Sequence, residues 1–271
     1  GIKVVGHCHD DFKEDSLGKI MRVFYLLLLD KILAVSEKVG RFFGTKARID
    51  GRVETVYNGI DAKRYDPELI EDIARKELGL SDKYFLIGSI GVIEKDKGQK
   101  YLIEAVSRLR SKGLTDIRCV ICGEGPEEAS LRHVAKDMGI ESLVLFLGFR
   151  RDIPRILRML DVLVIASLTI ESFSMAAAEA MSMKVPVIAT NTGGLPEVIE
   201  DGKTGMLVPP ADADAISNAI EHLVKNPSAK SEMGGNGRKR VLERFTVEEN
   251  VRKTEKIFMD LIEGNGLLLK E

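Results

Sequence analysis

Residues 171–180 read Glu-Ser-Phe-Ser-Met-Ala-Ala-Ala-Glu-Ala, and both the fold and the site can be worked out from this stretch. Glu171 stands in a turn, and Glu179 follows about two helical turns later inside an apolar helix. The first turn of a helix leaves backbone N–H groups unpaired, and here they belong to Ser172, Phe173, Ser174 and Met175. These groups make an anion site between the two carboxylates. By itself, such a glutamate pair is also typical of an amphipathic core helix, so the neighbouring sequence has to decide.

Short apolar runs flank this stretch on both sides. Residues 161–167 (Asp-Val-Leu-Val-Ile-Ala-Ser) and 185–190 (Val-Pro-Val-Ile-Ala-Thr) have the length and composition of buried strands, and the second ends in a turn at 191–194. A strand, loop, helix, strand series puts Glu171 at the carboxyl end of a parallel strand, where ligands of open α/β sheets bind. We therefore expect a ligand site, suited to a nucleotide sugar whose pyrophosphate the N–H groups hold.

These residues resemble the donor site of the retaining glycosyltransferases of family 4, which have the two-domain GT-B fold. The matching pieces are the Glu171-x7-Glu179 pair, the run at 185–190 and the segment 193–197 (Gly-Gly-Leu-Pro-Glu), in the family's order and spacing. The resemblance covers nearly the whole chain. It implies transfer of a sugar from a nucleotide-diphosphate sugar to a hydroxyl acceptor (a sugar, a lipid or a small molecule), with the anomeric configuration retained.

The resemblance also implies a catalytic role for Glu171 and Lys97. Glu171 would bind hydroxyls of the donor sugar, and Glu179 the ribose diol. Lys97 and the N–H groups of 173–175 would neutralise charge on the departing diphosphate. The family usually has an arginine after the first glycine of the loop at 91–98, where this chain has Val92, and Lys95 is a candidate substitute.

Histidines at the start of the chain form a further candidate site. His7 and His9 lie two apart, so they share one face of a strand end, and with Asp10 they could also be metal ligands or plain polar residues. The resemblance implies a catalytic His that reaches the donor sugar or the acceptor, and His9 fits it better than His7. The resemblance also implies further donor contacts at Gly91, Phe149 and Arg150.

The whole pattern predicts an α/β protein of the GT-B type. Alternating strands and helices indicate a Rossmann-like, doubly wound parallel sheet. Strands are expected at 84–90, 118–122, 143–147, 161–165 and 185–189. Helices are expected at 98–111, 126–138, 153–159 and 173–183, followed by helices alone at 212–224, 228–244 and 247–262, the last capped by Thr246.

The first part of the chain belongs to a second, incomplete Rossmann-like part. Strands are expected at 2–6, 31–35 and 53–57 and a helix at 17–29, with Ser36 capping the next one. The resemblance divides the chain into a remnant of the acceptor-side domain (1–60), a nucleotide-sugar-binding domain (61–245) and a helix that crosses back (246–271). Because the family's first domain has further strands, we expect either a fragment of a longer enzyme or a chain completed by a partner.

Composition limits the other functions. A formal net charge of −2 gives no attraction to nucleic acid, and no apolar run is long enough to span a membrane, so a cytoplasmic location is the default. Peripheral membrane contact and oligomer formation stay open. No acidic pair of the kind that holds a metal is present, and no cofactor is expected. Cys119 and Cys122 lie on one expected strand, on opposite faces, which argues against zinc.

Three other functions compete with the transferase. A catalytically incomplete nucleotide-sugar-binding module is the main alternative, favoured by the short first domain and by Val92. A nicotinamide dehydrogenase is disfavoured, because no Gly-x-Gly-x-x-Gly motif opens the first helix. The glutamate pair does not indicate a glycosidase, since Glu179 lies within a helix beside an expected phosphate site, which hydrolysis does not require.

Overall fold

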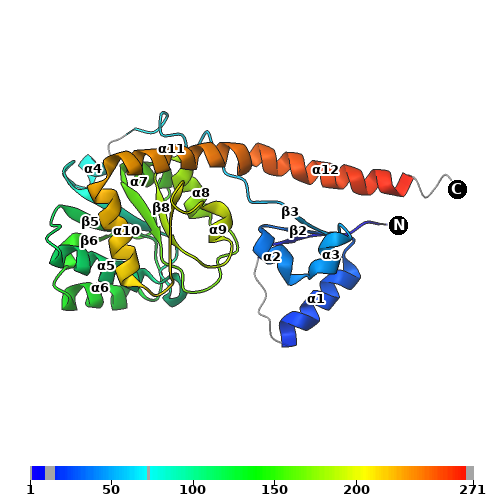
Figure 1. The fold of residues 1–271 in the computed structure, drawn as a ribbon, viewed down its shortest axis with the longest axis horizontal. Helices are drawn as coiled ribbons and strands as arrows, with labels where there is room; N and C mark the ends of the chain where they lie inside the picture. The colour runs from blue at the N-terminus through cyan, green and yellow to red at the C-terminus, as the bar shows by residue number, and fades with distance from the viewer. Residues whose placement is uncertain (1, 10–15, 72–73, 267–271) are drawn as a thin grey trace.

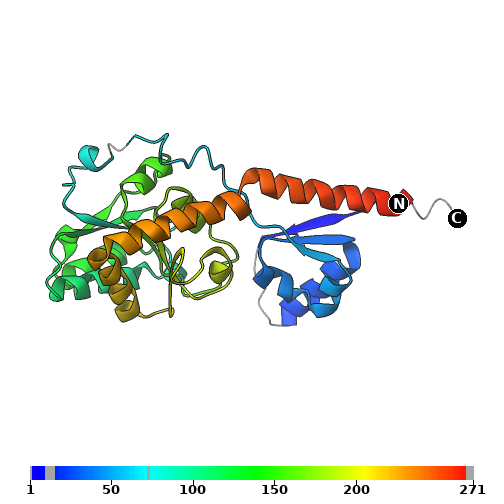
Figure 2. The same cartoon turned by 45° about the horizontal axis from the view of Figure 1, so that its top comes forward.

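The computed structural model describes residues 2–9, 16–71 and 74–266, which form two α/β units (Figure 1). We call residues 2–56 the small unit and residues 61–245 the large unit. A long helix, α12 (Val247–Gly266), leaves the large unit and runs along the small one, as Figures 1 and 2 both show. Among the described residues, no helix has the length and apolar content that crossing a membrane requires.

The small unit is a three-stranded parallel sheet in the order β1-β2-β3, with helices between the strands. The first strand begins later than expected, because Val4 does not join the ladder. Its N–H donates to the Asp30 carboxylate at 2.9 Å and its carbonyl accepts from the Asp30 N–H at 2.9 Å. The elements are β1 (Val5–Cys8), α1 (Ser16–Leu28), β2 (Lys31–Ala34), α2 (Glu37–Phe42), α3 (Thr45–Ile49) and β3 (Val53–Thr55).

The large unit contains a six-stranded parallel sheet in the order β6-β5-β4-β7-β8-β9. The five predicted strands are confirmed, and the sheet has one more, β9, which pairs with β8. The sequence did not predict β9 because the run begins with a glycine and ends at two prolines. The strands are β4 (Phe85–Ile90), β5 (Ile117–Cys122), β6 (Val144–Phe146), β7 (Val162–Ile165), β8 (Val187–Thr190) and β9 (Gly205–Val208).

Helices cover both faces of this sheet, which confirms the doubly wound α/β prediction. One apolar cluster joins the sheet to α7, α8 and α11, and the other joins it to α5, α6 and α10. Cys119 packs in the second cluster and Cys122 in the first, so the two thiols point to opposite faces as expected. The helices are α4 (Ala74–Glu77), α5 (Gln99–Ser111), α6 (Glu128–Asp137), α7 (Ile153–Met159), α8 (Met175–Ser182), α9 (Leu195–Val198), α10 (Ala213–Lys225) and α11 (Pro227–Arg244), with 3-10 turns η1 (Lys95–Lys97) and η2 (Glu141–Leu143).

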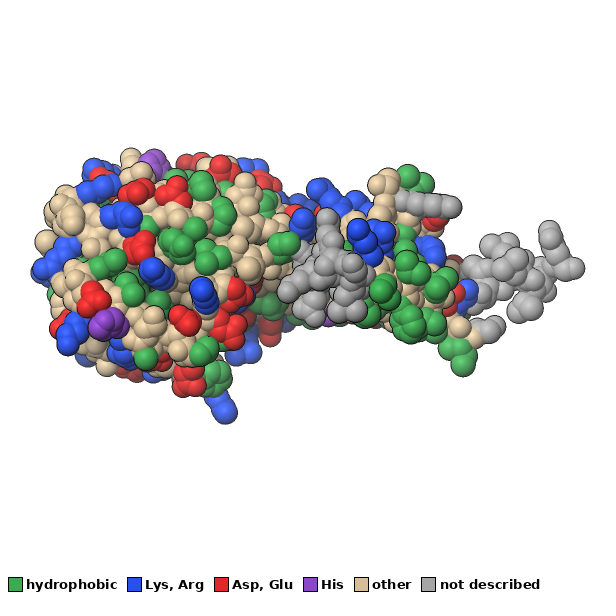
Figure 3. Space-filling view, turned by 90° about the horizontal axis from the view of Figure 1, so that it is seen from below, with side chains coloured by type: hydrophobic (Ala, Val, Ile, Leu, Met, Phe, Trp, Pro, Cys, Tyr) green, Lys and Arg blue, Asp and Glu red, His purple; other side chains and the backbone are tan. Residues whose placement is uncertain are grey.

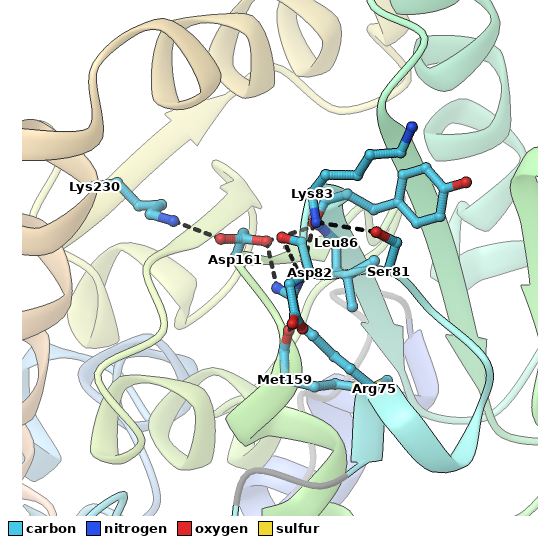
Figure 4. Close-up of polar contacts among 9 residues, drawn as sticks. Arg75, Ser81, Asp82, Lys83, Leu86, Met159, Asp161 and Lys230 are labelled. Atoms are coloured by element: carbon cyan, nitrogen blue, oxygen red, sulfur yellow. Dashed lines mark hydrogen bonds and ion pairs between the residues drawn. The ribbon is translucent and has the colours of Figure 1, made fainter.

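A partly buried carboxylate holds the amino edge of the large sheet together (Figure 4). Asp161 accepts from the Arg75 guanidinium at 2.8 Å, from the Leu86 N–H at 2.8 Å and from the Lys230 ammonium at 2.5 Å. These donors come from α4, β4 and α11, so one side chain ties three elements to the start of β7. The carboxyl edge, at the other ends of the strands, is left to the loops that form the site.

The two units are joined where α11 gives way to α12. The Ile60 N–H donates to the Phe245 carbonyl at 2.7 Å, and the Val247 N–H donates to the Ile60 carbonyl at 3.1 Å. Thr246 caps α12 as expected, because its hydroxyl accepts from the Glu249 N–H at 3.2 Å. Beyond this junction α12 packs on the small unit through a cluster that contains Leu33, Val56 and Ile257.

One face of the small unit is strongly apolar and exposed. Figure 3 views the molecule from below and shows apolar side chains gathered on this unit. Leu27 is 78% exposed and Ile20 is 63% exposed, although a surface helix of a monomeric protein normally turns such residues inward. We call this surface the α1 apolar face; it consists of Ile20, Val23, Phe24, Leu27 and Leu28.

Candidate functional site

The loop between β7 and α8 holds Glu171 at the carboxyl edge of the large sheet. One oxygen of its carboxylate accepts from the Lys97 ammonium at 3.1 Å and from the Ser167 hydroxyl at 3.0 Å. Lys97 comes from η1, which follows β4, so two neighbouring strands of the sheet each contribute a charge. The Glu171 side chain is only 19% exposed, and Lys97 neutralises it in this partly buried place.

Glu171 and Lys97 line a cavity of about 290 Å³, here called the Glu171 cavity. The helix α8 begins at this cavity, and its N-cap is Ser174, whose hydroxyl accepts from the Ala177 N–H at 3.4 Å. Among the described residues, none accepts from the N–H groups of Met175 and Ala176, which are therefore available to an anion. The cavity is also lined by Ser89, Ile90, Gly91, Val92, Gln99, Val164, Ile165, Ala166, Ser167 and Phe173.

The helix start lies two residues later than the sequence predicted, which changes the anion site. Ser172 is not among the lining residues, and its carbonyl instead packs behind the loop against Gly194. The N–H groups that face the cavity therefore belong to the segment from Phe173 to Ala176, one position farther along than expected. The displacement arises because the N-cap hydroxyl sits at Ser174, which fixes the first helical residue at Met175.

A glycine turn supports the loop from behind. The Gly194 N–H donates to the Glu171 carbonyl at 2.6 Å. A Cβ on Gly193 would lie 2.3 Å from the same carbonyl oxygen, and this residue has a φ of +58°. Both positions therefore require glycine, for space in each case and also for backbone angle at Gly193. The position of Glu171 depends on this turn.

A second cavity of about 300 Å³ adjoins the first and shares Ile90, Gly91 and Val92 with it. Phe149 and Arg150 line it, and Phe149 is 65% exposed. The Arg150 guanidinium donates two hydrogen bonds to the Asp152 carboxylate, at 2.8 and 2.6 Å, and these bonds lower the pKa of Asp152. The two cavities lie side by side at these three shared residues, and we call them together the bipartite site.

Among the described residues, the segment from Gly91 to Lys97 contributes one cation to this site, not two. Val92 lines both cavities and is 50% exposed. Lys95, the expected substitute for the family's arginine, lines a different cavity together with Glu94 and Lys100. The positive charge in the Glu171 cavity therefore comes from Lys97.

Glu179 lies one turn into α8, outside the lining of the Glu171 cavity. The hydroxyl of Tyr65 donates a hydrogen bond to its carboxylate. Burial raises the pKa of Glu179, and the bond from Tyr65 opposes this rise only in part. Burial and the neighbouring carboxylate likewise raise the pKa of Tyr65. Glu179 is thus a partly desolvated acceptor with a neutral donor beside it.

The candidate histidine lies in the small unit. His9 follows β1 and is exposed, and its ring lies 4.2 Å from the ring of His7, so the two do share one face. Burial, followed by the charge of His9, lowers the pKa of His7. His9 does not line the Glu171 cavity, and Asp10 lies outside the described residues. Within 2–9, 16–71 and 74–266, no three His, Cys, Asp or Glu side chains group so as to hold a metal.

Sequence reasoning missed several partners of the site. Ser167 ends the apolar run at 161–167, and a polar side chain at the carboxyl end of a predicted strand is a signal of a ligand site. Tyr65 and Tyr57 give no such signal, because only the fold brings them to Glu179 and Glu197. The sequence places Glu197 in the segment 193–197 but predicts no role for it.

The chain is similar in sequence to known proteins. Residues 70–240 match the family described as Glycosyl transferases group 1. N-acetyl-alpha-D-glucosaminyl L-malate synthase of Bacillus anthracis is 30% identical over 92% of this chain and 64% of its own length. The putative glycosyltransferase EpsD of Bacillus subtilis is 32% identical over 74% of this chain and 54% of its own length. The chain therefore spans less than two thirds of these relatives.

A solved structure shows the same architecture. HepE of Anabaena, in complex with UDP-glucose, superposes with a TM-score of 0.84 and is 25% identical, over 95% of this chain and 72% of that one. The similarity confirms the predicted α/β fold of the GT-B type, with a parallel sheet in each unit.

Proposed function

The chain belongs to the Glycosyl transferases group 1 family, and from this premise we propose that it is the donor-binding part of a retaining hexosyltransferase. In this proposal a sugar passes from a nucleotide-diphosphate sugar to a hydroxyl acceptor, and no metal takes part. The observation that supports it best is the bipartite site, in which a cation, a carboxylate and a helix start line the first cavity and an exposed aromatic ring lines the second.

The chemistry of each cavity suits one end of such a donor. The N–H groups of Met175 and Ala176 and the ammonium of Lys97 would hold the diphosphate, since both favour negative charge. The neighbouring cavity would hold the base against Phe149, with Gly91 at the rim between the two. The similarity to HepE supports this choice of ligand, because HepE was solved in complex with UDP-glucose.

Lys97 and Glu171 would exchange partners when the donor binds. In the structure they form an ion pair at 3.1 Å, which keeps two charges compensated in a partly buried place. A diphosphate would draw Lys97 toward itself, and the released Glu171 oxygen would accept a sugar hydroxyl. As the glycosidic bond breaks, the same ammonium and N–H groups would stabilise the charge that grows on the departing diphosphate, without further rearrangement.

Roles for two further residues rest on the resemblance to the family. Glu179 would accept hydrogen bonds from the ribose hydroxyls once the Tyr65 hydroxyl gives way or shares its acceptor. His9 would face the donor sugar or the acceptor from the small unit. The acceptor would therefore bind between the two units.

A second candidate function is a nucleotide-sugar-binding module that does not catalyse transfer. Val92 favours this alternative, because an exposed apolar side chain lines both cavities where a second phosphate cation is expected. Both functions predict that a nucleotide sugar binds, but only the transferase predicts that the bound sugar is transferred or hydrolysed. An assay of transfer or donor hydrolysis, made after binding has been shown, therefore separates them.

Calorimetric titration with UDP, GDP and ADP, and with UDP-glucose and GDP-mannose, tests the proposal. We expect saturable binding of one base without metal. Glu179→Ala should weaken nucleotide binding by about 1–3 kcal/mol, because a desolvated acceptor is lost. Glu171→Ala should instead reduce the preference for the nucleotide sugar over the bare nucleotide. Glu243→Ala, which removes an exposed carboxylate of α11, is the matched control. Binding that is absent, or equal in all three variants, contradicts the proposal.

A further inference from the structure

The Glu197 side chain reaches from the large unit to the small one. It extends from α9, and its two carboxylate oxygens accept from the N–H groups of Glu37 and Lys38, each at 2.7 Å. These N–H groups belong to the first turn of α2, where the helix offers no acceptor of its own. The hydroxyl of Tyr57, in the segment between the units, donates to the same carboxylate at 3.1 Å. Glu197 therefore accepts three hydrogen bonds from outside the large unit.

We propose that Glu197 is a positioning residue that couples the orientation of the small unit to the loop holding Glu171. The inference rests on the proposed function, because it assigns this loop to donor binding. The coupling adds two effects to that function. A ligand bound to the large unit would fix the orientation of the small unit, and the small unit would in turn hold the Glu171 loop in position.

The first part of the connection runs through the backbone of the glycine turn. Gly194 is the N-cap of α9 and donates to the Glu171 carbonyl at 2.6 Å, while Glu197 lies in the same short helix. Ser172 and Glu171 leave no space for a Cβ at Gly194 or Gly193. A shift of α9 by a few tenths of an ångström would therefore be transmitted to the backbone at Glu171.

The second part of the connection runs through aromatic rings. The ring of Tyr57 lies 6.1 Å from that of Phe173, which lines the Glu171 cavity, and 5.3 Å from that of Phe245. Phe173 and Phe245 also contact each other, at 5.6 Å. Burial, followed by the charge of Glu197, raises the pKa of Tyr57 to about 12, so its hydroxyl stays a donor at physiological pH.

The chain crossings alone do not fix the angle between the units. The backbone crosses at Ile60 and again at Phe245–Val247, and hydrogen bonds place these two crossings next to each other. Two adjacent crossings by themselves leave rotation about the line that joins them unconstrained, and α12 constrains it through the cluster of Leu33, Val56 and Ile257. Glu197 supplies a further contact between the units. The negative charge of Glu37 at the start of α2 would oppose this contact, but Arg48 forms an ion pair with the Glu37 carboxylate and compensates that charge.

Residue-resolved amide exchange by NMR tests the contact directly. In Glu197→Ala we expect the amides of Glu37 and Lys38 to exchange about tenfold faster or more, since two charge-assisted hydrogen bonds are lost. The Val39 amide, which donates to the Ser36 hydroxyl within the small unit at 3.2 Å, should change little. Glu243→Ala should leave all three amides unchanged. Equal exchange in Glu197→Ala and in the parent chain overturns the inference.

The coupling is tested with UDP and GDP and their sugar conjugates as probes. In the parent chain the bound nucleotide sugar should slow exchange at Glu37 and Lys38 further, and in Glu197→Ala it should not. A ligand effect that persists in the variant, or is absent in a parent chain that binds, overturns the coupling. If no probe binds, the proposed function fails and the coupling with it, while the contact between the units is still decided by the exchange without ligand.

A second variant guards against loss of folding. Glu197→Gln keeps one carbonyl oxygen as an acceptor, while its NH2 group cannot accept the other amide. It should release one of the two amides and leave the other protected. A variant that melts cooperatively and still protects both amides contradicts the assigned geometry.

Discussion

At the scale of single residues, the partly buried carboxylate of Glu179 lowers the stability of the folded protein at neutral pH. Burial disfavours the charged carboxylate, so the pKa of Glu179 in the folded chain lies above its ordinary value of 4.5. The unfolded chain then loses its proton at lower pH than the folded chain does. Glu179 therefore contributes its full share to the free energy of unfolding at a pH below its pKa in the unfolded chain. That share is lost as the pH rises through the pKa of Glu179 in the folded chain.

We therefore predict that Glu179→Gln is more stable than the parent chain at about pH 7 and equally stable at about pH 4, where both side chains are neutral. The glutamine carbonyl can still accept from Tyr65. Urea unfolding at the two pH values measures the difference. The same variant should bind nucleotide more weakly, and a stability gain that does not depend on pH would contradict the explanation.

The sequence predicted which residues line the site better than it predicted their hydrogen-bond partners. Gly91, Lys97, Glu171 and Phe173 do line one cavity, because a helix start at the carboxyl end of a strand leaves little freedom. Their hydrogen-bond partners could not be predicted, since Tyr65 reaches Glu179 only through the fold. The composition of the sequence also does not reveal that Lys184 adopts a φ of +59°, a backbone angle that favours glycine.

Among the helices, α11 contains neighbouring glycines with opposite environments. A Cβ at Gly234 would lie 2.2 Å from the carbonyl oxygen of Lys184, so this glycine allows α11 to approach the end of α8. A Cβ at Gly235 would meet nothing within 4 Å. The intrinsic cost of glycine in a helix is the same at both positions.

We predict that Gly234→Ala destabilises the protein by about 1–3 kcal/mol, because the backbone of Lys184 must move. Gly235→Ala should stabilise it by about 0.5–1 kcal/mol, the usual gain when alanine replaces glycine in a helix. Thermal melts of the pair at one protein concentration give the comparison. Equal shifts of the two variants would mean that α11 does not pack at this distance.

Elements were predicted well where periodicity and length agreed. The predicted helices from 98–111 onward are all found, starting within two residues of the expected position. Errors occurred where contacts distant in sequence decide the outcome. β9 forms because β8 offers it an edge, β1 starts late because Asp30 holds Val4, and α8 starts late because Ser174 provides the cap.

On the scale of the whole molecule, the α1 apolar face is a large exposed apolar surface that another molecule could cover. Its five side chains are all more than half exposed, and they belong to one helix. Contiguous apolar surface of this kind normally marks an interface. Oligomer formation and membrane contact both stay predictions for this surface.

We predict that the chain self-associates through this face as its concentration rises. Sedimentation velocity should show the average mass increasing with concentration, and the double substitution Phe24→Lys and Leu27→Lys should reduce the increase. Leu69→Lys replaces an equally exposed apolar residue of the large unit and should have no effect. A parent chain that stays monomeric at every concentration contradicts the prediction.

The position of α12 has a consequence for the order in which the protein is made. Its Ile257 packs with Leu33 and Val56, so the core of the small unit contains residues from opposite ends of the sequence. A ribosome delivers the strands of the small unit about 190 residues before it delivers that helix. The large unit can close its sheet in the meantime, because domains fold as units during synthesis. The small unit is therefore completed after the large one.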